Sequence, residues 1–182
     1  MVVDAFSVPH DAQDPVGFLL RTPVASIGLL TDLGHATRLA LERVRRANVL
    51  ILESNHDVKM LQDCPHRPWS LKQRILSRHG HLSNEAAADA AEQIVSADLR
   101  HLYLGHISQQ CNCPDLAFEV MQERLQRIGA QHIQLQLTSQ NTPCSTLELD
   151  AAAEAPPPLM SPLPISLLPK EAPTVGAQSC ES

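Results

Sequence analysis

Short apolar runs alternate with helical patterns along most of this chain, and this alternation constrains the fold more than any other feature. The runs have the length and composition of buried strands, and they are VGFLLR (16–21), ASIGLLT (25–31), NVLILE (48–53), LRHLYLG (99–105) and HIQLQL (132–137). Helical spacing of apolar residues appears in ATRLALERVRRA (36–47), NEAAADAAEQIVSA (84–97) and PDLAFEVMQERLQRIG (114–129). Because strands that alternate with helices pack as a sheet covered by helices, the pattern predicts an α/β fold.

Composition changes near residue 150 and divides the chain into two parts. Of the 182 residues, 43% are hydrophobic, which suffices for one ordinary core, so residues 1–149 are expected to form a single domain. Residues 150–182 hold seven of the 14 prolines and show no helical or strand period. We expect this tail to be disordered, and a docking segment at residues 163–168 is the alternative.

Cysteine usage and hydropathy exclude several classes of protein. The five cysteines are an odd number at irregular spacing, which is typical of reduced thiols rather than of a disulfide framework. The first residues, MVVDAFSVPHD, have neither the basic region nor the apolar stretch of a signal peptide. No run approaches the ~20 apolar residues that a membrane helix needs. The sequence therefore predicts a cytoplasmic protein without a membrane segment.

Polar side chains follow three of the predicted strands. Asp32, Glu53 and His106 each lie where an apolar run gives way to a loop. In open α/β sheets the ligand site lies outside the carboxyl ends of the strands, so these side chains are expected to lie close together. With His10 they form a set of carboxylate and imidazole groups suited to a metal ion. A turn-forming role is the alternative for Asp32, which lies just before Gly34.

Five separate stretches of the sequence carry a resemblance to a known family. They are FSVPHDAQDPVGF, LLTDLGH, LILESNHD, GHLSNEAA and LYLGHIS, in this order along residues 6–108. In that order and at these spacings they resemble the later part of the metallo-β-lactamase fold, in the phosphodiesterase and exonuclease branch that is similar to ribonuclease Z. The resemblance covers about residues 2–149.

The resemblance implies a fold, a cofactor and roles for five residues. The fold would be the C-terminal half of an αββα sandwich, a mixed sheet with flanking helices. His10, Asp32 and His106 match metal-ligand positions, and Asp32 matches the carboxylate shared by two divalent ions, zinc or manganese. Glu53 and His81 match catalytic positions near the scissile phosphate. The implied activity is metal-dependent hydrolysis of phosphodiester bonds in nucleic acid.

The sequence also departs from the family pattern. The family's main metal motif, His-x-His-x-Asp-His, lies upstream of the position of His10 and does not occur in these 182 residues, where HGH at 79–81 is followed by LSN. A late start, a split gene and a degenerate copy are all left open. The alternative function is a non-catalytic remnant, or a subunit that needs a separate N-terminal half. Without that half, the sheet is expected to expose an apolar face.

One basic segment is the candidate for contact with substrate. Residues 65–84 contain no acid in a chain of net charge −6, and their basic residues are Arg67, Lys72, Arg74 and Arg78. Positive charge beside Trp69 is typical of binding to phosphates and bases, so single-stranded nucleic acid is the predicted partner. The alternative is an amphipathic helix with a solvated basic face, whose apolar side chains fill the core: Trp69, Leu71, Ile75 and Leu76.

Two histidines near the predicted site complete the substrate-binding candidates. His35 follows Asp32 by three residues, and His56 follows Glu53 by three. With Arg74 and Arg78 they are expected to contact substrate. A surface loop histidine is the alternative for His35.

Overall fold

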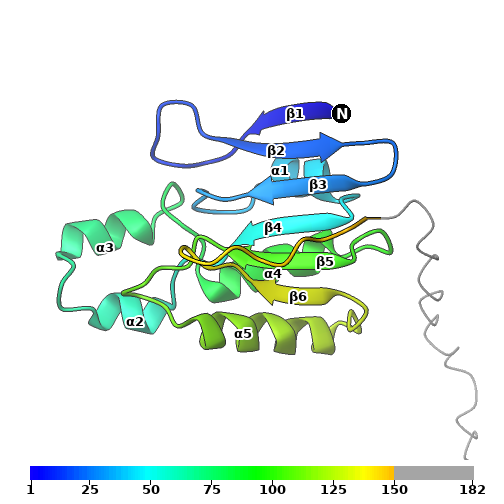
Figure 1. The fold of residues 1–182 in the computed structure, drawn as a ribbon. Helices are drawn as coiled ribbons and strands as arrows, with labels where there is room; N and C mark the ends of the chain where they lie inside the picture. The colour runs from blue at the N-terminus through cyan, green and yellow to red at the C-terminus, as the bar shows by residue number, and fades with distance from the viewer. Residues whose placement is uncertain (150–182) are drawn as a thin grey trace, which may run out of the picture.

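The computed structural model of the chain describes residues 1–149, which form one mixed sheet with helices (Figure 1). The sheet has six strands in the order β1-β2-β3-β4-β5-β6. They are β1 (Val2–Ser7), β2 (Val16–Arg21), β3 (Ser26–Leu30), β4 (Val49–Glu53), β5 (His101–Gly105) and β6 (Gln134–Leu137). The helices are α1 (Arg38–Val44), α2 (Val58–Asp63), α3 (Trp69–Ile75), α4 (Asn84–Ile94) and α5 (Pro114–Arg127). None of the helices in this part of the chain is long and apolar enough to cross a membrane.

The predicted α/β fold is confirmed, and the structure adds two elements that the sequence analysis does not predict. All five predicted strands and all three predicted helices are present. The additional strand β1 lies at the edge of the sheet and buries only Phe6, so its sequence lacks a clear apolar alternation. The additional helix α2 has six residues and buries only Leu61. The tail predicted to be disordered, including residues 163–168, lies outside the described residues.

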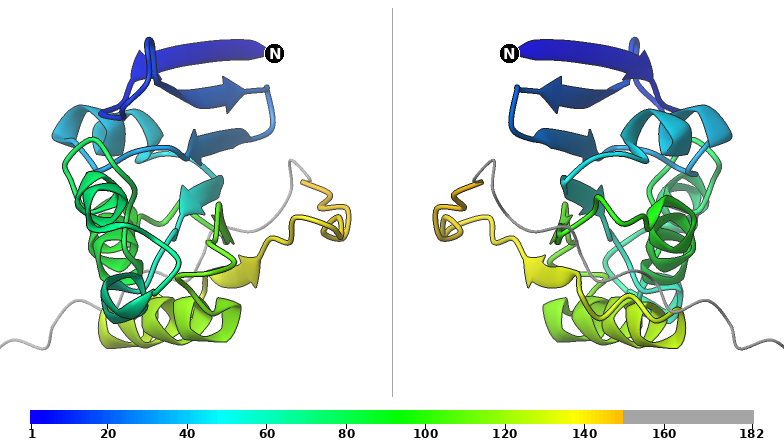
Figure 2. Two further views of the ribbon diagram at one scale, coloured as in Figure 1. Left: turned by 90° about the vertical axis from the view of Figure 1, so that its left-hand side faces the viewer. Right: turned by 90° about the vertical axis from the view of Figure 1, so that its right-hand side faces the viewer.

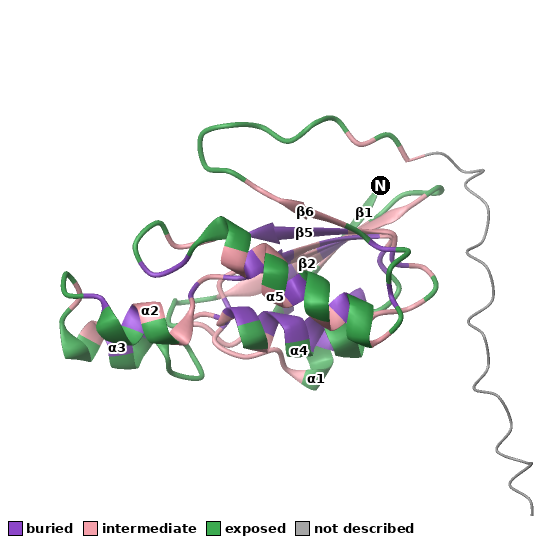
Figure 3. Ribbon diagram, turned by 90° about the horizontal axis from the view of Figure 1, so that it is seen from below, coloured by how far each residue is buried: buried purple, intermediate pink, exposed green. Residues whose placement is uncertain are grey.

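Three helices cover one face of the sheet and bury the main core. Figures 2 and 3 show α1, α4 and α5 on the same side of the strands. Two rows of residues paired across β3, β4 and β5 point toward them: Gly28, Leu50 and Leu102, then Leu30, Leu52 and Leu104. Gly28 allows β3 to approach α1, because a Cβ there would meet Val44 at 3.1 Å. Hydrophobic burial on this face is the main stabilising term of the domain.

The opposite face of the sheet is also apolar, but most of its side chains are only half-buried. Phe18, Leu29 and Ile51 are direct partners across β2, β3 and β4, so their side chains lie on one face, and all three have intermediate exposure. Leu20 and Ile27 form a second such pair. The apolar second face expected from the sequence is therefore present in the described residues.

The order of the strands brings the ends of several strands to one edge. β3, β4, β5 and β6 run parallel, so their carboxyl ends point in the same direction. Figure 1 shows these arrowheads facing the side on which α2 and α3 lie. The loops that follow the strands converge there, as they do in other open α/β sheets.

The helix α3 differs from the amphipathic helix considered from the sequence. Trp69 is 61% exposed and Leu76 is 38% exposed, so the interpretation that they fill the core is wrong. Lys72 is buried instead, and its Nζ donates to the carbonyl of Gln62 at 2.7 Å. Only Ile75, with Leu71 against it, joins a small second cluster of apolar side chains. The helix α3 is short and packs against few neighbours. The spacing of its apolar residues therefore does not determine which of its faces is buried.

Substitutions on the two faces of the sheet are expected to differ in their effect on stability. We expect the 182-residue chain to bind a hydrophobic dye and to self-associate, because half-buried apolar rows are available on the open face. Leu29→Thr with Ile51→Thr reduces dye fluorescence and self-association while a cooperative melt is retained. As the control on the covered face, Leu50→Ala lowers the free energy of unfolding by about 2–5 kcal/mol, since Leu50 is fully buried. A monodisperse wild-type chain without dye binding would contradict the expectation.

Candidate metal centre

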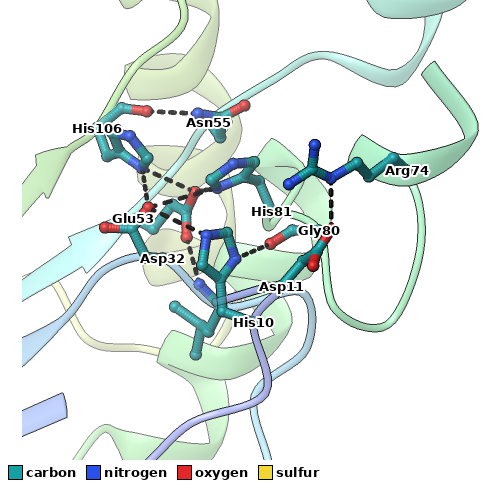
Figure 4. Close-up of polar contacts among 10 residues, drawn as sticks. His10, Asp11, Asp32, Glu53, Asn55, Arg74, Gly80, His81 and His106 are labelled. Carbon is teal, nitrogen blue, oxygen red and sulfur yellow. Dashed lines mark hydrogen bonds and ion pairs between the residues drawn. The ribbon is translucent and has the colours of Figure 1, made fainter. Parts of the chain in front are cut away.

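Three polar residues stand at the carboxyl ends of adjacent parallel strands. Glu53 is the last residue of β4, Asp32 lies two residues after β3, and His106 directly follows β5. Glu53 is also the register partner of Gly105, the residue before His106. Figure 4 shows these side chains converging with His10 and His81. The structure therefore brings together the five residues to which the sequence analysis assigns metal-binding and catalytic roles.

The backbone at two of these positions adopts an unfavourable conformation. Asp32 has φ 57° and His106 has φ 55°, and in the described residues no other residue except a glycine has a positive φ. The left-handed region costs free energy for residues with a Cβ, and it recurs at functional sites where the surrounding structure holds it. At a strand end this conformation turns the chain sharply, and both side chains face the same centre (Figure 4).

Glu53 is the buried anion that joins the centre. Its side chain has 0% exposure and accepts hydrogen bonds from His81 Nδ1 at 2.7 Å, His106 Nδ1 at 3.1 Å and the Leu33 N–H at 2.9 Å. Burial acts to raise the pKa of Glu53, but these hydrogen bonds together lower it below its usual range. Conversely, the hydrogen bond to Glu53 raises the pKa of His106, against the effect of burial. Glu53 is therefore held as a carboxylate that orients two imidazole rings.

His10 and Asp32 complete the centre from the other side. His10, in the loop between β1 and β2, donates through Nδ1 to the carbonyl of Gly80 at 2.9 Å, which leaves Nε2 free and 3.7 Å from Asp32 Oδ1. The same Asp32 oxygen lies 3.6 Å from His106 Nδ1 and 4.0 Å from His81 Nδ1. A histidine whose second nitrogen is held by a carbonyl is the arrangement that metal ligands usually show.

The donor set fits divalent cations. Two groups of residues have ligand atoms within 4.8 Å of one another: His10, Asp32 and His81 form one, and Glu53, His81 and His106 form the other. Imidazole nitrogens with carboxylate oxygens suit zinc and other divalent transition metals. The two groups overlap at His81, so their donor atoms form one continuous centre.

Two glycines that the sequence analysis did not single out hold the loops of the centre together. A Cβ added at Gly34 would overlap the backbone of Arg78 and Gly80, and one added at Gly80 would overlap the carbonyl oxygens of Ile75 and Arg74. The loop after β3 and the loop before His81 therefore touch backbone to backbone. In the sequence, the signal for Gly34 is its position two residues after Asp32, and the signal for Gly80 is its position between His79 and His81.

A third supporting residue, Asn55, fixes the backbone of His106. Its Nδ2 donates to the His106 carbonyl at 2.8 Å, and its own carbonyl accepts from the Ser108 N–H at 2.8 Å (Figure 4). Asn55 lies two residues after Glu53 in the stretch ESNHD. Closeness to Glu53 is the signal that would have identified it.

The four candidates for substrate contact lie in different environments. His35 and Arg78 pair with each other, since Arg78 donates to His35 Nε2 at 2.8 Å and His35 Nδ1 donates to the Arg78 carbonyl at 3.0 Å. Arg74 forms an ion pair with Asp11 and lines a cavity beside the centre. His56 is buried, with 1% exposure, and its Nδ1 has no hydrogen-bond partner.

The cavity extends from the centre toward α3 and has a volume of about 780 Å³. His10, His81 and His106 line one end of it. The polar part of the remaining wall includes two arginines, one acid, amides and hydroxyls, which are Arg67, Arg74, Asp11, Asn55, Gln109, Gln110, Gln140, Ser108, Ser139 and Thr138. The apolar part consists of Leu61, Leu71, Ile75 and Ile107. The two arginines and the many hydrogen-bonding groups suit a ligand that carries polar or anionic groups.

The sequence was compared with family models and with curated proteins. No family model matches the chain. It is 36% identical over 127 residues to the exodeoxyribonuclease YycJ of Bacillus anthracis and 37% identical over 123 residues to the exodeoxyribonuclease WalJ of Streptococcus pneumoniae. These matches cover 70% and 68% of the chain and 48% and 45% of the relatives, so the chain spans about half the length of the curated relatives it matches.

The structure is similar to that of the metallo-β-lactamase fold protein YhfI of Bacillus subtilis. The TM-score is 0.50 at 12% identity, and the match covers 75% of this chain and 46% of that one. The described residues therefore have the metallo-β-lactamase fold, and the resemblance to its exonuclease branch is confirmed by the two relatives.

The environment of His56 predicts a loss of stability in acid. Burial lowers the pKa of His56 from 6.5 to about 4, although the charge of Glu53 acts to raise it. Between these values the unfolded chain binds the proton and the folded chain does not, so stability falls as the pH falls. From pH 7 to pH 5 the contribution of His56 is a loss of about 2 kcal/mol. Urea unfolding measures it, and His56→Gln makes the decline correspondingly shallower. An equal decline in both proteins would contradict the assignment.

Proposed function

We propose that this chain carries the site of a metal-dependent hydrolase that acts on phosphodiester bonds in nucleic acid. The observation that carries the proposal is the convergence of His10, His81 and His106 with two carboxylates at the carboxyl ends of parallel strands. The similarity to two exodeoxyribonucleases supports nucleic acid as the substrate class. The polar, cationic cavity beside the centre supports an anionic substrate.

In this proposal His10, Asp32 and His106 hold two divalent cations, zinc or manganese, with Asp32 shared between them. Asp32 Oδ1 lies within 4 Å of nitrogens on both of these histidines, which supports the shared role. Bound divalent cations supply Lewis-acid polarisation of the phosphoryl group and activation of water. The chain contributes the anionic charge of Asp32 and a fixed orientation of both rings.

His81 and Glu53 have the roles of general acid and orienting base. The 2.7 Å hydrogen bond from His81 Nδ1 to Glu53 fixes the orientation of the ring and leaves Nε2 as the nitrogen that can transfer a proton to the leaving oxygen. Because His81 lines the cavity, this proton faces the space available for substrate. Glu53 is buried and touches no space for substrate, so it acts through the imidazole.

The cationic side chains near the cavity are proposed to bind the phosphate backbone. Arg74 lines the cavity and is the first candidate, while His35 and Arg78 form a pair on the loop beside it. His56 is buried behind the centre and would support the strand-end loops rather than touch substrate. Contacts to phosphate position single-stranded nucleic acid without reading its sequence.

A second candidate function is a subunit or non-catalytic remnant whose site requires a separate N-terminal half. The half-buried apolar face of the sheet, with Phe18, Leu29 and Ile51, favours it, because a second sheet packed there would bury these side chains. In that case the chain alone hydrolyses no phosphodiester at any metal concentration. Turnover by the chain itself would argue against this candidate.

Metal binding tests the ligand assignment. With His10 and Asp32 on one cation and Asp32 and His106 on the other, the 182-residue chain is expected to bind zinc or manganese well short of stoichiometrically at micromolar free metal. Asp32→Ala removes the remaining binding, because both cations lose their shared anion. Asp14→Ala, a change of an exposed carboxylate in the loop that contains His10, leaves binding unchanged. Equilibrium dialysis measures all three proteins. Near-stoichiometric binding that is lost on His10→Ala would show that the site is complete.

Hydrolysis tests the role of His81. The substrates are bis(p-nitrophenyl) phosphate and single-stranded DNA. In a protein completed by the N-terminal half that carries the remaining metal ligands, we expect His81→Ala to retain the metal content of the unsubstituted protein and to slow turnover ~100- to ~10,000-fold, the usual effect of removing a general acid. His132→Ala, on the exposed turn before β6, is the matched control and changes neither quantity. Loss of metal from His81→Ala equal to that from Asp32→Ala would make His81 a ligand, and no change at all would make it a structural loop histidine.

A further inference from the structure

We propose that Cys64 and Cys111 are a reactive dithiol, outside the metal centre, that peroxide oxidises to a disulfide. Cys64 immediately follows α2 and Cys111 lies in the loop between β5 and α5. Both are free and buried in one small cluster with Leu61 and Ile75, separate from the main core. The proposal does not depend on the hydrolase function.

The two thiols belong to one cluster of four buried side chains, and the backbone around them is held in place. The Cys111 thiol lowers the pKa of the Cys64 thiol, and Cys64 raises the pKa of the Cys111 thiol, which are the effects of two thiols that lie close together. The carbonyl of Cys111 accepts from the Asp57 N–H at 2.9 Å, at the residue that caps α2, and the Cys111 N–H donates to Ser108 Oγ at 3.2 Å. These bonds fix the loop against α2, so the sulfurs are juxtaposed by the fold rather than by chance encounter.

Positive charge surrounds the pair. The charge of the Arg67 guanidinium acts to lower the pKa of both thiols, and the charge of the Lys72 ammonium acts to lower the pKa of Cys64. Burial acts to raise the pKa of the Cys64 thiol, but the His66 N–H, the Cys111 thiol and these two cations together lower it below its ordinary value. Nearby cations and hydrogen-bond donors are what favours the thiolate in reactive cysteines. Cys64 is therefore the attacking sulfur and Cys111 the resolving one.

The cavity reaches the pair at Cys111. Cys111, Leu61 and Ile75 line the same cavity as the metal centre, and Arg67 lies on its wall. A hydroperoxide is small and polar enough to enter a space of about 780 Å³. Cys113 and Cys144 are exposed and lie outside the cluster, so they have no such arrangement.

The chemistry balances with hydrogen peroxide as the oxidant. The Cys64 thiolate attacks one peroxide oxygen, the O–O bond breaks, and water leaves after protonation, so Cys64 becomes a sulfenic acid. The Cys111 sulfur then attacks the Cys64 sulfur, the S–S bond forms, and the sulfenic oxygen leaves as a second water with the proton of the Cys111 thiol. Two thiols are oxidised and one peroxide is reduced to two waters.

Differential alkylation of the full chain tests the proposal. Cys111 and Cys113 lie in one tryptic peptide, residues 101–124, so the measurement uses Cys113→Ser, a change at an exposed side chain. After treatment with a few equivalents of hydrogen peroxide, we expect mass spectrometry to show that peptide linked to residues 60–72, which contain Cys64. Dithiothreitol restores both thiols. The oxidised chain also melts at a higher temperature, because the disulfide closes a long loop in the unfolded state.

Two further variants test the order of events. In Cys111→Ser the sulfenic acid has no resolving thiol, so a cyclic diketone labels Cys64, whereas Cys64→Ser gives no such label on Cys111. Two results overturn the proposal: both thiols of Cys113→Ser stay open to alkylation after denaturation of the treated protein, or the linked peptides contain Cys144 instead. Labelling of Cys111 in Cys64→Ser reverses the assigned roles and contradicts that part of the proposal.

Discussion

The centre depends on one buried carboxylate. Glu53 has no exposed surface, and an isolated anion in that position would cost several kcal/mol in lost hydration. It is stable there because His81, His106 and the Leu33 N–H all donate to it. These donors come from three different loops, so satisfying one charge also fixes the relative position of the loops. The geometry of the candidate metal centre follows from this requirement.

The loops have little freedom to arrange themselves differently. Gly34 and Gly80 let two loop backbones touch, and the pair of His35 with Arg78 closes the same junction. The left-handed backbone at Asp32, in the first of these loops, costs free energy that these contacts help to offset. A site that is rigid before any ligand arrives loses less entropy on binding, which is the usual reason for placing strain next to reactive groups.

The sheet itself is asymmetric, and this asymmetry bears on both proposed functions. One face is closed by α1, α4 and α5, whereas the other presents rows of half-buried apolar side chains. The chain also spans less than half the length of the two exodeoxyribonucleases. The open face is the surface on which the second candidate function depends. The thiol pair at Cys64 and Cys111 is independent of that question, because all of its contacts lie within the described residues.

The sequence by itself determined the alternation of strands and helices and the placing of Asp32, Glu53 and His106 at strand ends, because apolar period and strand termination are local properties. It did not predict β1 or α2, whose burial is too slight to leave a pattern. Only the tertiary structure decided that Trp69 is exposed, that Glu53 is the shared partner of two histidines, and that loops far apart in sequence touch through glycines. Each of these depends on which segments meet in space, and no window of sequence contains both partners of such a contact.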